Sequence, residues 1–237
     1  MQNSAGGKSA TAMKWAIAGF AIIFALLSAP AAALAVSALE PARTVVVDAG
    51  HGGMDGGVTG VNTGVKESDL NLVMAKLLGE YLKSGGFDVV YTRRTSGGLY
   101  KEGDVNKKSA DMHRRAEIIS RADPVAVVSI HMNTFFQKSR RGAQVFFDPS
   151  SAKGESLALA VQEELNRTFN LPDAGRGFSP LGADKFILQQ SSAPSVIVEC
   201  GFLSNPSDEA HLLDADYRAR FAYSVFVAIA AYLSSEA

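Results

Sequence analysis

The sequence has a single cysteine, Cys200, and this scarcity excludes two kinds of site. No intramolecular disulfide can form, and a zinc site built from several thiolates is ruled out. Histidine is almost as scarce. Any metal must therefore be held by imidazoles and carboxylates, and the only candidate imidazoles are His51, His113, His131 and His211.

The sequence also lacks an excess of charge of either sign. Its 23 basic and 24 acidic side chains give a formal net charge of −1. Residues 1–35 hold two lysines and no acidic residue, so the remainder carries 21 basic against 24 acidic side chains. This balance gives no electrostatic reason to expect nucleic-acid binding. The hydrophobic share of 47% excludes a disordered chain.

Charged residues are absent from Trp15 to Leu39. Trp15–Leu27 has the length of a signal-peptide core, and Ala33-Leu34-Ala35 fits a cleavage pattern. About 25 uncharged residues are also enough to span a bilayer as an uncleaved anchor. We therefore interpret residues 1–39 as a signal peptide or an N-terminal membrane anchor. No second hydrophobic span follows, so residues 40–237 are expected outside the cytoplasmic membrane, either secreted or anchored by this segment.

Residues 40–237 alternate between strand-like and helix-like patterns, and their number fits one domain with a sizeable core. The strand-like segments are continuous apolar runs, which suits a sheet covered on both faces. We expect a single α/β layered domain with a central, mostly parallel sheet and helices on both faces. Predicted strands are 43–48, 87–92, 124–130, 142–147, 185–189 and 195–199, and predicted helices are 68–84, 111–121, 155–169, a short one from 206, and 217–233.

Two of the predicted helices begin with capping signals. Ser68 is a plausible N-cap for the helix that Gly85-Gly86 ends. Asn205 is a plausible N-cap for the short helix, with Pro206 at the first helical position.

Three polar residues stand where apolar runs end. His51 follows TVVVDAG, His131 follows VAVVSI, and Glu199 closes SVIV. If these strands are parallel, the three side chains reach the same edge of the sheet, where α/β proteins form their sites. Two imidazoles and a carboxylate form the ligand set of hydrolytic zinc, and such a site also needs a general base. The residues alone leave open whether Glu67 or Glu199 is the ligand.

Each candidate also has a plainer structural interpretation. Glu199 follows three apolar residues, and a buried carboxylate is costly without a charged partner or a metal, which favours function. Glu67 stands near a helix start, where it would also suit the helix dipole. His113 and His211 are expected in solvent, and Cys200 as a small buried side chain.

The glycine-rich turn AGHGGMDGG lacks the phosphate-loop pattern, and it contains Asp55 where a phosphate would need positive charge. Its glycines instead allow a sharp turn that brings His51 close to a metal. A basic stretch after His131 is interpreted either as a rim that meets substrate carboxylates or as a solvated loop; it holds Lys138, Arg140 and Arg141.

Four blocks in order give the sequence a family resemblance: VVVDAGHGGMDGG, KESDLNL, SIHMN and VIVECGFLSNP. From about Thr44 to Tyr232 the chain resembles the zinc-dependent N-acetylmuramoyl-L-alanine amidases of the amidase 3 family. The resemblance implies that zinc is bound by His51, Glu67 and His131 and that Glu199 is the catalytic carboxylate. It also implies supporting positions at Arg93, Arg115 and Asn133.

Enzymes of this family cleave the amide between the lactyl group of N-acetylmuramic acid and L-alanine of the stem peptide, so the implied partner is peptidoglycan. Zinc polarises the carbonyl and activates water, and the free carboxylate carries the proton. A single domain behind one hydrophobic segment, with GAQVFF after SIHMN, is most similar to the germination-specific amidases of spore formers. Those act on cortex peptidoglycan toward muramic lactam.

Several family members carry an inserted helix that plugs the site, and the connections after His131 and Phe147 are too short for one here. An activating protein partner would then act by stabilising the domain or its metal. Two alternatives remain open: another wall-directed zinc peptidase that cuts within the stem peptide, and a non-catalytic wall-binding module on the same fold. The module would be marked by loss of a ligand or of Glu199, and none of these is lost.

Overall fold

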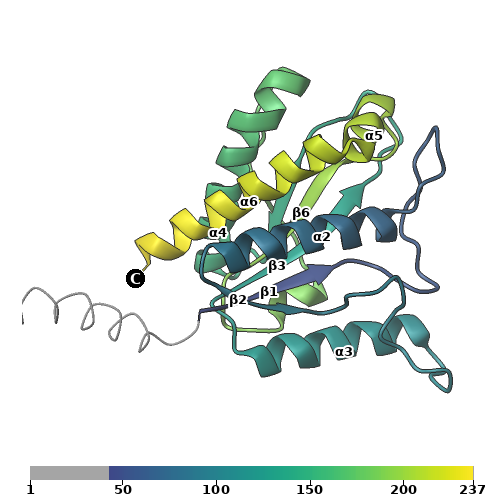
Figure 1. Ribbon diagram of the computed structural model, residues 1–237, viewed down its shortest axis with the longest axis vertical. Coiled ribbons are helices and arrows are strands. Elements are labelled where there is room, and N and C mark those ends of the chain that lie inside the picture. The colour runs from purple at the N-terminus through teal and green to yellow at the C-terminus, as the bar shows by residue number, and fades with distance from the viewer. Residues whose placement is uncertain (1–42, 237) are drawn as a thin grey trace, which may run out of the picture. The chain divides into compact units, whose positions relative to one another are not determined.

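The computed structural model describes residues 43–236. The predicted N-terminal segment, residues 1–39, and the boundary after it lie outside the described residues. Six strands form one sheet in the order β2-β1-β3-β6-β4-β5 (Figure 1). Their bounds are β1 Thr44–Ala49, β2 Asp88–Tyr91, β3 Ala126–Asn133, β4 Gln144–Phe147, β5 Leu181–Gly182 and β6 Ser195–Phe202.

The helices connect these strands. The α-helices are α2 Glu67–Ser84, α3 Lys107–Ala122, α4 Ala152–Leu165, α5 Pro206–Leu213 and α6 Ala215–Ser235. A π-helical segment, η1 (Asn166–Ala174), continues α4, and a short 3-10 helix, η2 (Phe186–Gln189), precedes β6. No helix within residues 43–236 is long and apolar enough to cross a membrane.

Four neighbouring strands of the sheet are parallel. β1 pairs in parallel with β2 and β3, and β3 pairs in parallel with β6. β4 runs antiparallel to β6 and carries the two-residue β5 at the far edge. The expectation of a mostly parallel sheet is confirmed, and the carboxyl ends of β1, β3 and β6 therefore meet at one edge.

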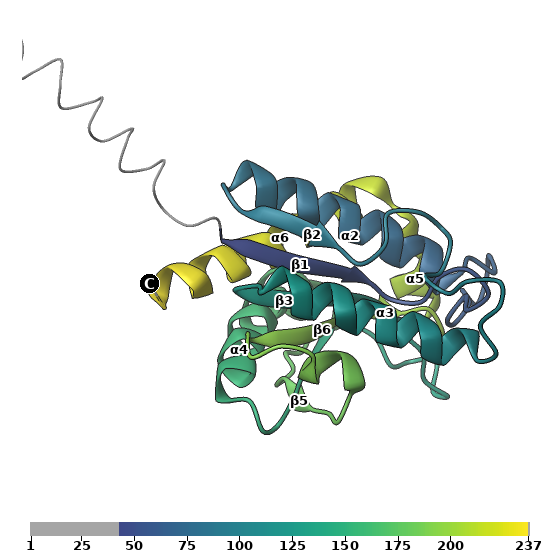
Figure 2. The ribbon, with the colours of Figure 1, turned by 90° about the horizontal axis from the view of Figure 1, so that it is seen from below.

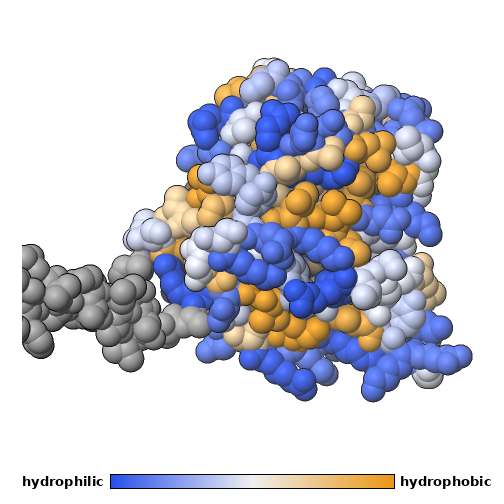
Figure 3. All heavy atoms as spheres, viewed as in Figure 1, coloured by the Kyte–Doolittle hydropathy of each residue, from blue (hydrophilic) through white to orange (hydrophobic). Residues whose placement is uncertain are grey.

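Helices cover both faces of the sheet, as expected (Figures 1 and 2). On one face, α2, α4 and α6 pack on a large core that includes Val45 and Val47 of β1. On the other face, α3 and η2 cover a smaller core that includes Val46 of the same strand. Successive residues of one strand thus serve opposite cores, which explains why the strands read as continuous apolar runs. Apolar side chains also reach the surface among polar ones on the α2 and α6 side (Figure 3).

The segment 185–189, predicted as a strand, is the 3-10 helix η2, so that prediction is wrong. Leu188 N–H donates to the Lys185 carbonyl, which closes the short helical turn. Ile187 and Leu188 are both buried in the smaller core. In a strand, consecutive side chains point to opposite faces of the sheet, so these two neighbours could not share one core. The apolar run therefore packs on one face of the sheet and does not form a strand of it.

Ser68 is not the N-cap of α2, because the helix begins one residue earlier and Lys66 holds the cap position. Backbone carbonyls of the glycine-rich turn satisfy the first helical N–H groups: Glu67 N–H donates to Val58 and Ser68 N–H donates to Gly56. A tertiary contact replaces the side-chain cap here. The other capping prediction is confirmed, since the Asn205 side chain accepts hydrogen bonds from the first turn of α5.

Candidate active site

The residues that the sequence singled out lie at the edge of the sheet where the carboxyl ends of β1, β3 and β6 meet, called here the active edge. His51 follows β1, Glu67 opens α2, and His131 lies in β3. β3 and β6 extend past their predicted ends, so His131 and Glu199 are register partners within the sheet. Paired residues on neighbouring strands lie about 5 Å apart, which places Glu199 beside His131.

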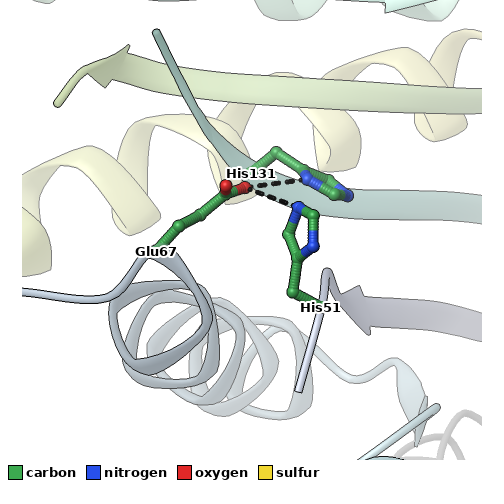
Figure 4. Close-up of side chains that lie close together, drawn as sticks. All are labelled: His51, Glu67 and His131. Carbon is green, nitrogen blue, oxygen red and sulfur yellow. Dashed lines mark hydrogen bonds and ion pairs between the residues drawn. The ribbon is translucent and has the colours of Figure 1, made fainter. Parts of the chain in front are cut away.

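The side chains of His51, Glu67 and His131 converge on one point (Figure 4). Glu67 Oε1 lies 3.0 Å from His131 Nδ1 and 3.2 Å from His51 Nε2. The three residues offer ligand atoms that all lie within 4.8 Å of one another. This donor set of two imidazoles and one carboxylate fits a divalent metal such as zinc.

Two glycines make room for this arrangement. A Cβ atom on Gly50 would lie 2.2 Å from the His131 ring, and one on Gly57 would lie 2.3 Å from Glu67 Oε2. His51 itself has a φ of 58°, in the left-handed region that few non-glycine residues adopt. The glycine-rich turn therefore brings the backbone close to the ligand candidates, as the sequence predicted.

Glu67 is the most firmly held of these groups, with a side chain only 2% exposed. Its Oε1 accepts the Met132 N–H at 3.1 Å, and its Oε2 accepts the Val58 N–H at 2.9 Å. Burial alone would raise its pKa, but His131 and His51 hold the pKa of the Glu67 carboxyl well below its usual range. Glu67 is therefore an ionised carboxylate in a fixed position.

Asp55 orients His51, a role that the sequence analysis missed. Its Oδ2 lies 3.0 Å from His51 Nδ1, so Nε2 is left facing Glu67. Lys108 lies 3.0 Å from the same oxygen. Burial alone would lower the pKa of His51, and the carboxylates of Glu67 and Asp55 raise it above its usual value. A carboxylate on the outer nitrogen is the usual support of a metal-binding histidine, and the spacing of His51 and Asp55 in one tight turn was the available signal.

Two buried arginines donate hydrogen bonds to the backbone around His51. Arg93 donates to the carbonyls of Ala49 and Gly50, and Arg115 donates to those of Ala49 and His51. Arg115 is 1% exposed and lies 2.6 Å from Asp48, and also bonds to a second carboxylate on α3. The two arginines therefore fix the backbone around His51, which is the supporting role that the resemblance implied.

The third supporting position of the resemblance, Asn133, lies at the end of β3. Its side chain accepts the Thr134 N–H, and its carbonyl accepts the Leu203 N–H. These bonds fix the turn after β3 next to the end of β6.

The loop that leads into Glu67 is fixed by Glu209 of α5, which the sequence analysis also missed. The Glu209 side chain is 1% exposed, and its carboxylate accepts hydrogen bonds from the backbone of Asn62 and from the backbone and hydroxyl of Thr63. No local pattern pointed to it, because the contact joins segments about 150 residues apart.

Glu199 differs from every other carboxylate at this edge. Its Oε2 is buried and has no hydrogen-bond partner among the described residues. Burial raises the pKa of the Glu199 carboxyl to about 7, a shift that His131 opposes and the negative charge of Glu67 increases. A group with a free oxygen and a pKa near neutrality suits proton transfer.

The remaining sequence candidates lie away from the ligand cluster. His113 is exposed on α3, and His211 on α5 is partly exposed and lies 3.9 Å from Asp173. Cys200 is buried in the main core, as expected. In the basic stretch, Arg140 lies over aromatic rings that include Phe178.

The ligand cluster is open to substrate. The side chains of His51 and His131 keep 22% and 21% of their area exposed. Both line a cleft that Glu67, Asn133 and Glu199 also line. Substrate can therefore reach the histidines without displacement of any described segment.

A mostly parallel α/β sheet with a candidate metal centre and an unpaired acid at one edge defines a hydrolase-like site. Residues 45–231 match the family model described as N-acetylmuramoyl-L-alanine amidase, and the chain belongs to this family. It is a peptidoglycan amidase by this membership.

Individual relatives agree with the family assignment. A germination-specific N-acetylmuramoyl-L-alanine amidase of Bacillus subtilis is 30% identical over 197 residues, covering 82% of this chain and 81% of the relative. The CwlD amidase of Clostridioides difficile, solved in complex with the GerS lipoprotein, has 34% identity and a TM-score of 0.77, covering 81% of this chain and 99% of that one. An N-acetylmuramoyl-L-alanine amidase of Clostridium difficile 630 has 26% identity and a TM-score of 0.71, and the match covers 83% of this chain and 99% of that one.

Proposed function

We propose that this protein is a zinc-dependent amidase that cleaves the bond between N-acetylmuramic acid and L-alanine. His51, Glu67 and His131 would bind the zinc, and Glu199 would act as the general base and acid. One observation carries the proposal: three donor atoms within 4.8 Å stand beside a buried carboxylate oxygen that has no partner.

The roles of the two carboxylates follow from their surroundings. Glu67 is held ionised by two imidazoles and by backbone N–H groups, which suits a metal ligand. Glu199 is register partner of His131 but takes no part in the cluster of possible ligand atoms. An unpaired carboxylate next to a metal site is the arrangement that a proton carrier needs.

Zinc, when bound, supplies polarisation of the scissile carbonyl and activation of a water molecule. Glu199 accepts a proton from the attacking water at its free oxygen. It then delivers this proton to the leaving nitrogen of L-alanine as the carbon–nitrogen bond breaks. Asp55 holds the His51 ring throughout, and the two buried arginines hold the backbone that carries it.

The relatives support a more specific setting. The similarity to a germination-specific amidase and to CwlD favours spore-cortex peptidoglycan as the substrate, on the way to muramic lactam. The complex of CwlD with a lipoprotein supports an activating protein partner for this chain as well. We infer that the domain acts outside the cytoplasmic membrane, reached through residues 1–39 as a signal peptide or anchor, with residues 40–237 as the catalytic domain.

The test is mass spectrometry of purified peptidoglycan digested by the protein, with and without a chelator. We expect free stem peptides that begin with L-alanine, together with glycan strands that carry free lactyl groups, and no such products after chelation. Cuts within the stem peptide would instead identify a peptidase. Sedimentation with the wall without any product would identify a binding module.

A further inference from the structure

A separate pocket lies beside the ligand cluster. Its cavity volume is about 200 Å³, and His51 and His131 both line it. Ile197 lines it too and precedes Glu199 by two residues on β6, so both side chains face the α3 side of the sheet. Met112 of α3 and Ile187 of η2 complete an apolar wall. The pocket therefore continues from the reacting groups along the face of the sheet that α3 and η2 cover.

The charged groups that line this pocket are almost all paired with one another. Arg115 bonds to Asp48 and Asp111, and Lys108 contacts Asp55 at 3.0 Å. Lys185 is the exception, because it makes no ion pair with any of the described residues. It stands at the start of η2 and is exposed. The pocket thus combines an apolar lining with one cation that is available to an anionic ligand.

The second cleft at the site differs in shape and lining. It is the more open of the two, and it shares His51 and His131 with the pocket. A glycan strand continues in both directions from any one sugar, so it needs an open cleft. A stem peptide is a short branch from the strand, so it fits a more enclosed pocket. Two differently shaped spaces that share the histidines therefore suit the two parts of the substrate that a muramoyl–peptide bond joins.

We propose that the pocket binds the stem peptide and that the Lys185 ammonium pairs with the carboxylate of the acidic residue that follows L-alanine. This inference rests on the proposed amidase function. A mostly apolar pocket with a small number of polar groups that fix the orientation of the ligand is the usual design of a specific ligand site. An extended chain advances about 3.3–3.6 Å per residue, so this carboxylate is the first anionic group beyond the scissile bond and lies within about 7 Å of it.

Three synthetic substrates separate the possible sources of the carboxylate. The first is N-acetylmuramoyl-L-alanyl-γ-D-glutamyl-L-lysinamide, whose only carboxylate is on the second residue. The second has D-isoglutamine at that position and carries no carboxylate. The third has D-isoglutamine followed by L-lysine with a free C-terminus, so its only carboxylate is terminal. The full-length protein, its Lys185→Ala and Lys185→Arg variants, and a Lys153→Ala control are assayed for kcat and KM on each. Lys153 is an exposed lysine of α4 that lines neither space.

We expect Lys185→Ala to lower kcat/KM about 10-fold for the first substrate, chiefly through KM, as loss of one charge-assisted hydrogen bond would. The other two substrates should change less than about 2-fold, Lys185→Arg should retain most of the preference, and Lys153→Ala should change nothing. An equal loss on all three substrates, or a loss that follows the terminal carboxylate, would overturn the inference and leave the amidase function intact. Purified peptidoglycan is digested in parallel: cleavage of peptidoglycan with the same kinetics in Lys185→Ala as in the unmodified protein would overturn the inference alone, and cuts only within the stem peptide would overturn the amidase function.

Discussion

The two sides of the active edge are built on opposite principles. On the β1 side, each group has several partners: Glu67 accepts backbone N–H groups, Asp55 holds His51, and buried arginines hold the carbonyls around it. On the β6 side, Glu199 is half-buried, with one buried carboxylate oxygen unpaired among the described residues and its pKa raised to about 7. Metal ligands need fixed positions, whereas a proton carrier needs a free lone pair. The contrast identifies the unpaired Glu199 oxygen as a burial that costs stability and serves proton transfer.

Removing a ligand should have the largest effect. His51→Ala or His131→Ala should lose metal and activity together, because the remaining donors cannot complete the site. Metal content by atomic emission and turnover on peptidoglycan measure this. The matched control is His113→Ala on the exposed face of α3, which should change neither. Full zinc occupancy in both ligand variants would refute the assignment.

Breaking the support beneath the β1 side should lower stability strongly. Arg115→Ala leaves Asp48 as an uncompensated buried charge, so we expect a loss of about 3–5 kcal/mol in the free energy of unfolding. Urea denaturation measures it. The neighbour Arg114 pairs with Asp104 near the surface, and Arg114→Ala should cost no more than about 1 kcal/mol. Equal losses in the two variants would mean that the buried network contributes little.

The metal-free protein should show the burial of Glu199 as a pH effect. A pKa raised from 4.5 to about 7 means that the unfolded chain ionises first, so this group makes stability fall as pH rises between those values. Glu199→Gln stays neutral and should therefore be more stable than the unmodified protein at pH 8, by about 1–3 kcal/mol. Near pH 4 the two should be similar. Urea denaturation with chelator present checks this, and a difference independent of pH would contradict it.

Loosening the His51 ring should have a smaller effect. Asp55→Asn weakens the support of His51 Nδ1, and we expect zinc affinity to fall about 10–100-fold, as is typical for such groups. Competition with a chromophoric chelator measures the affinity. Asp69, an exposed carboxylate in the first turn of α2, provides the control, and Asp69→Asn should leave affinity unchanged. An unchanged affinity in Asp55→Asn would show that the glycine-rich turn holds the ring by itself.

Structural features that depend on short stretches of sequence were predictable from the sequence. The apolar runs predicted the central strands, and their parallel order predicted that His51, His131 and Glu199 would share one edge. What failed depends on contacts between distant segments. The run at 185–189 forms a helical turn that packs in the smaller core, and the first N–H groups of α2 bond to the carbonyls of Val58 and Gly56. The Asp55 contact is a different case, because it is local to one tight turn and its spacing from His51 was a signal that the sequence analysis did not use.

The division of labour between the two glutamates is tested most directly by measuring zinc content and turnover in Glu67→Gln and Glu199→Gln side by side. Both substitutions keep the shape of the side chain. Glu199→Gln should retain zinc and lose at least about 10²-fold in turnover, the usual contribution of a general acid–base group. Glu67→Gln should bind zinc weakly. If Glu199→Gln loses the metal while Glu67→Gln keeps it, the two carboxylates have the opposite roles and the account is wrong.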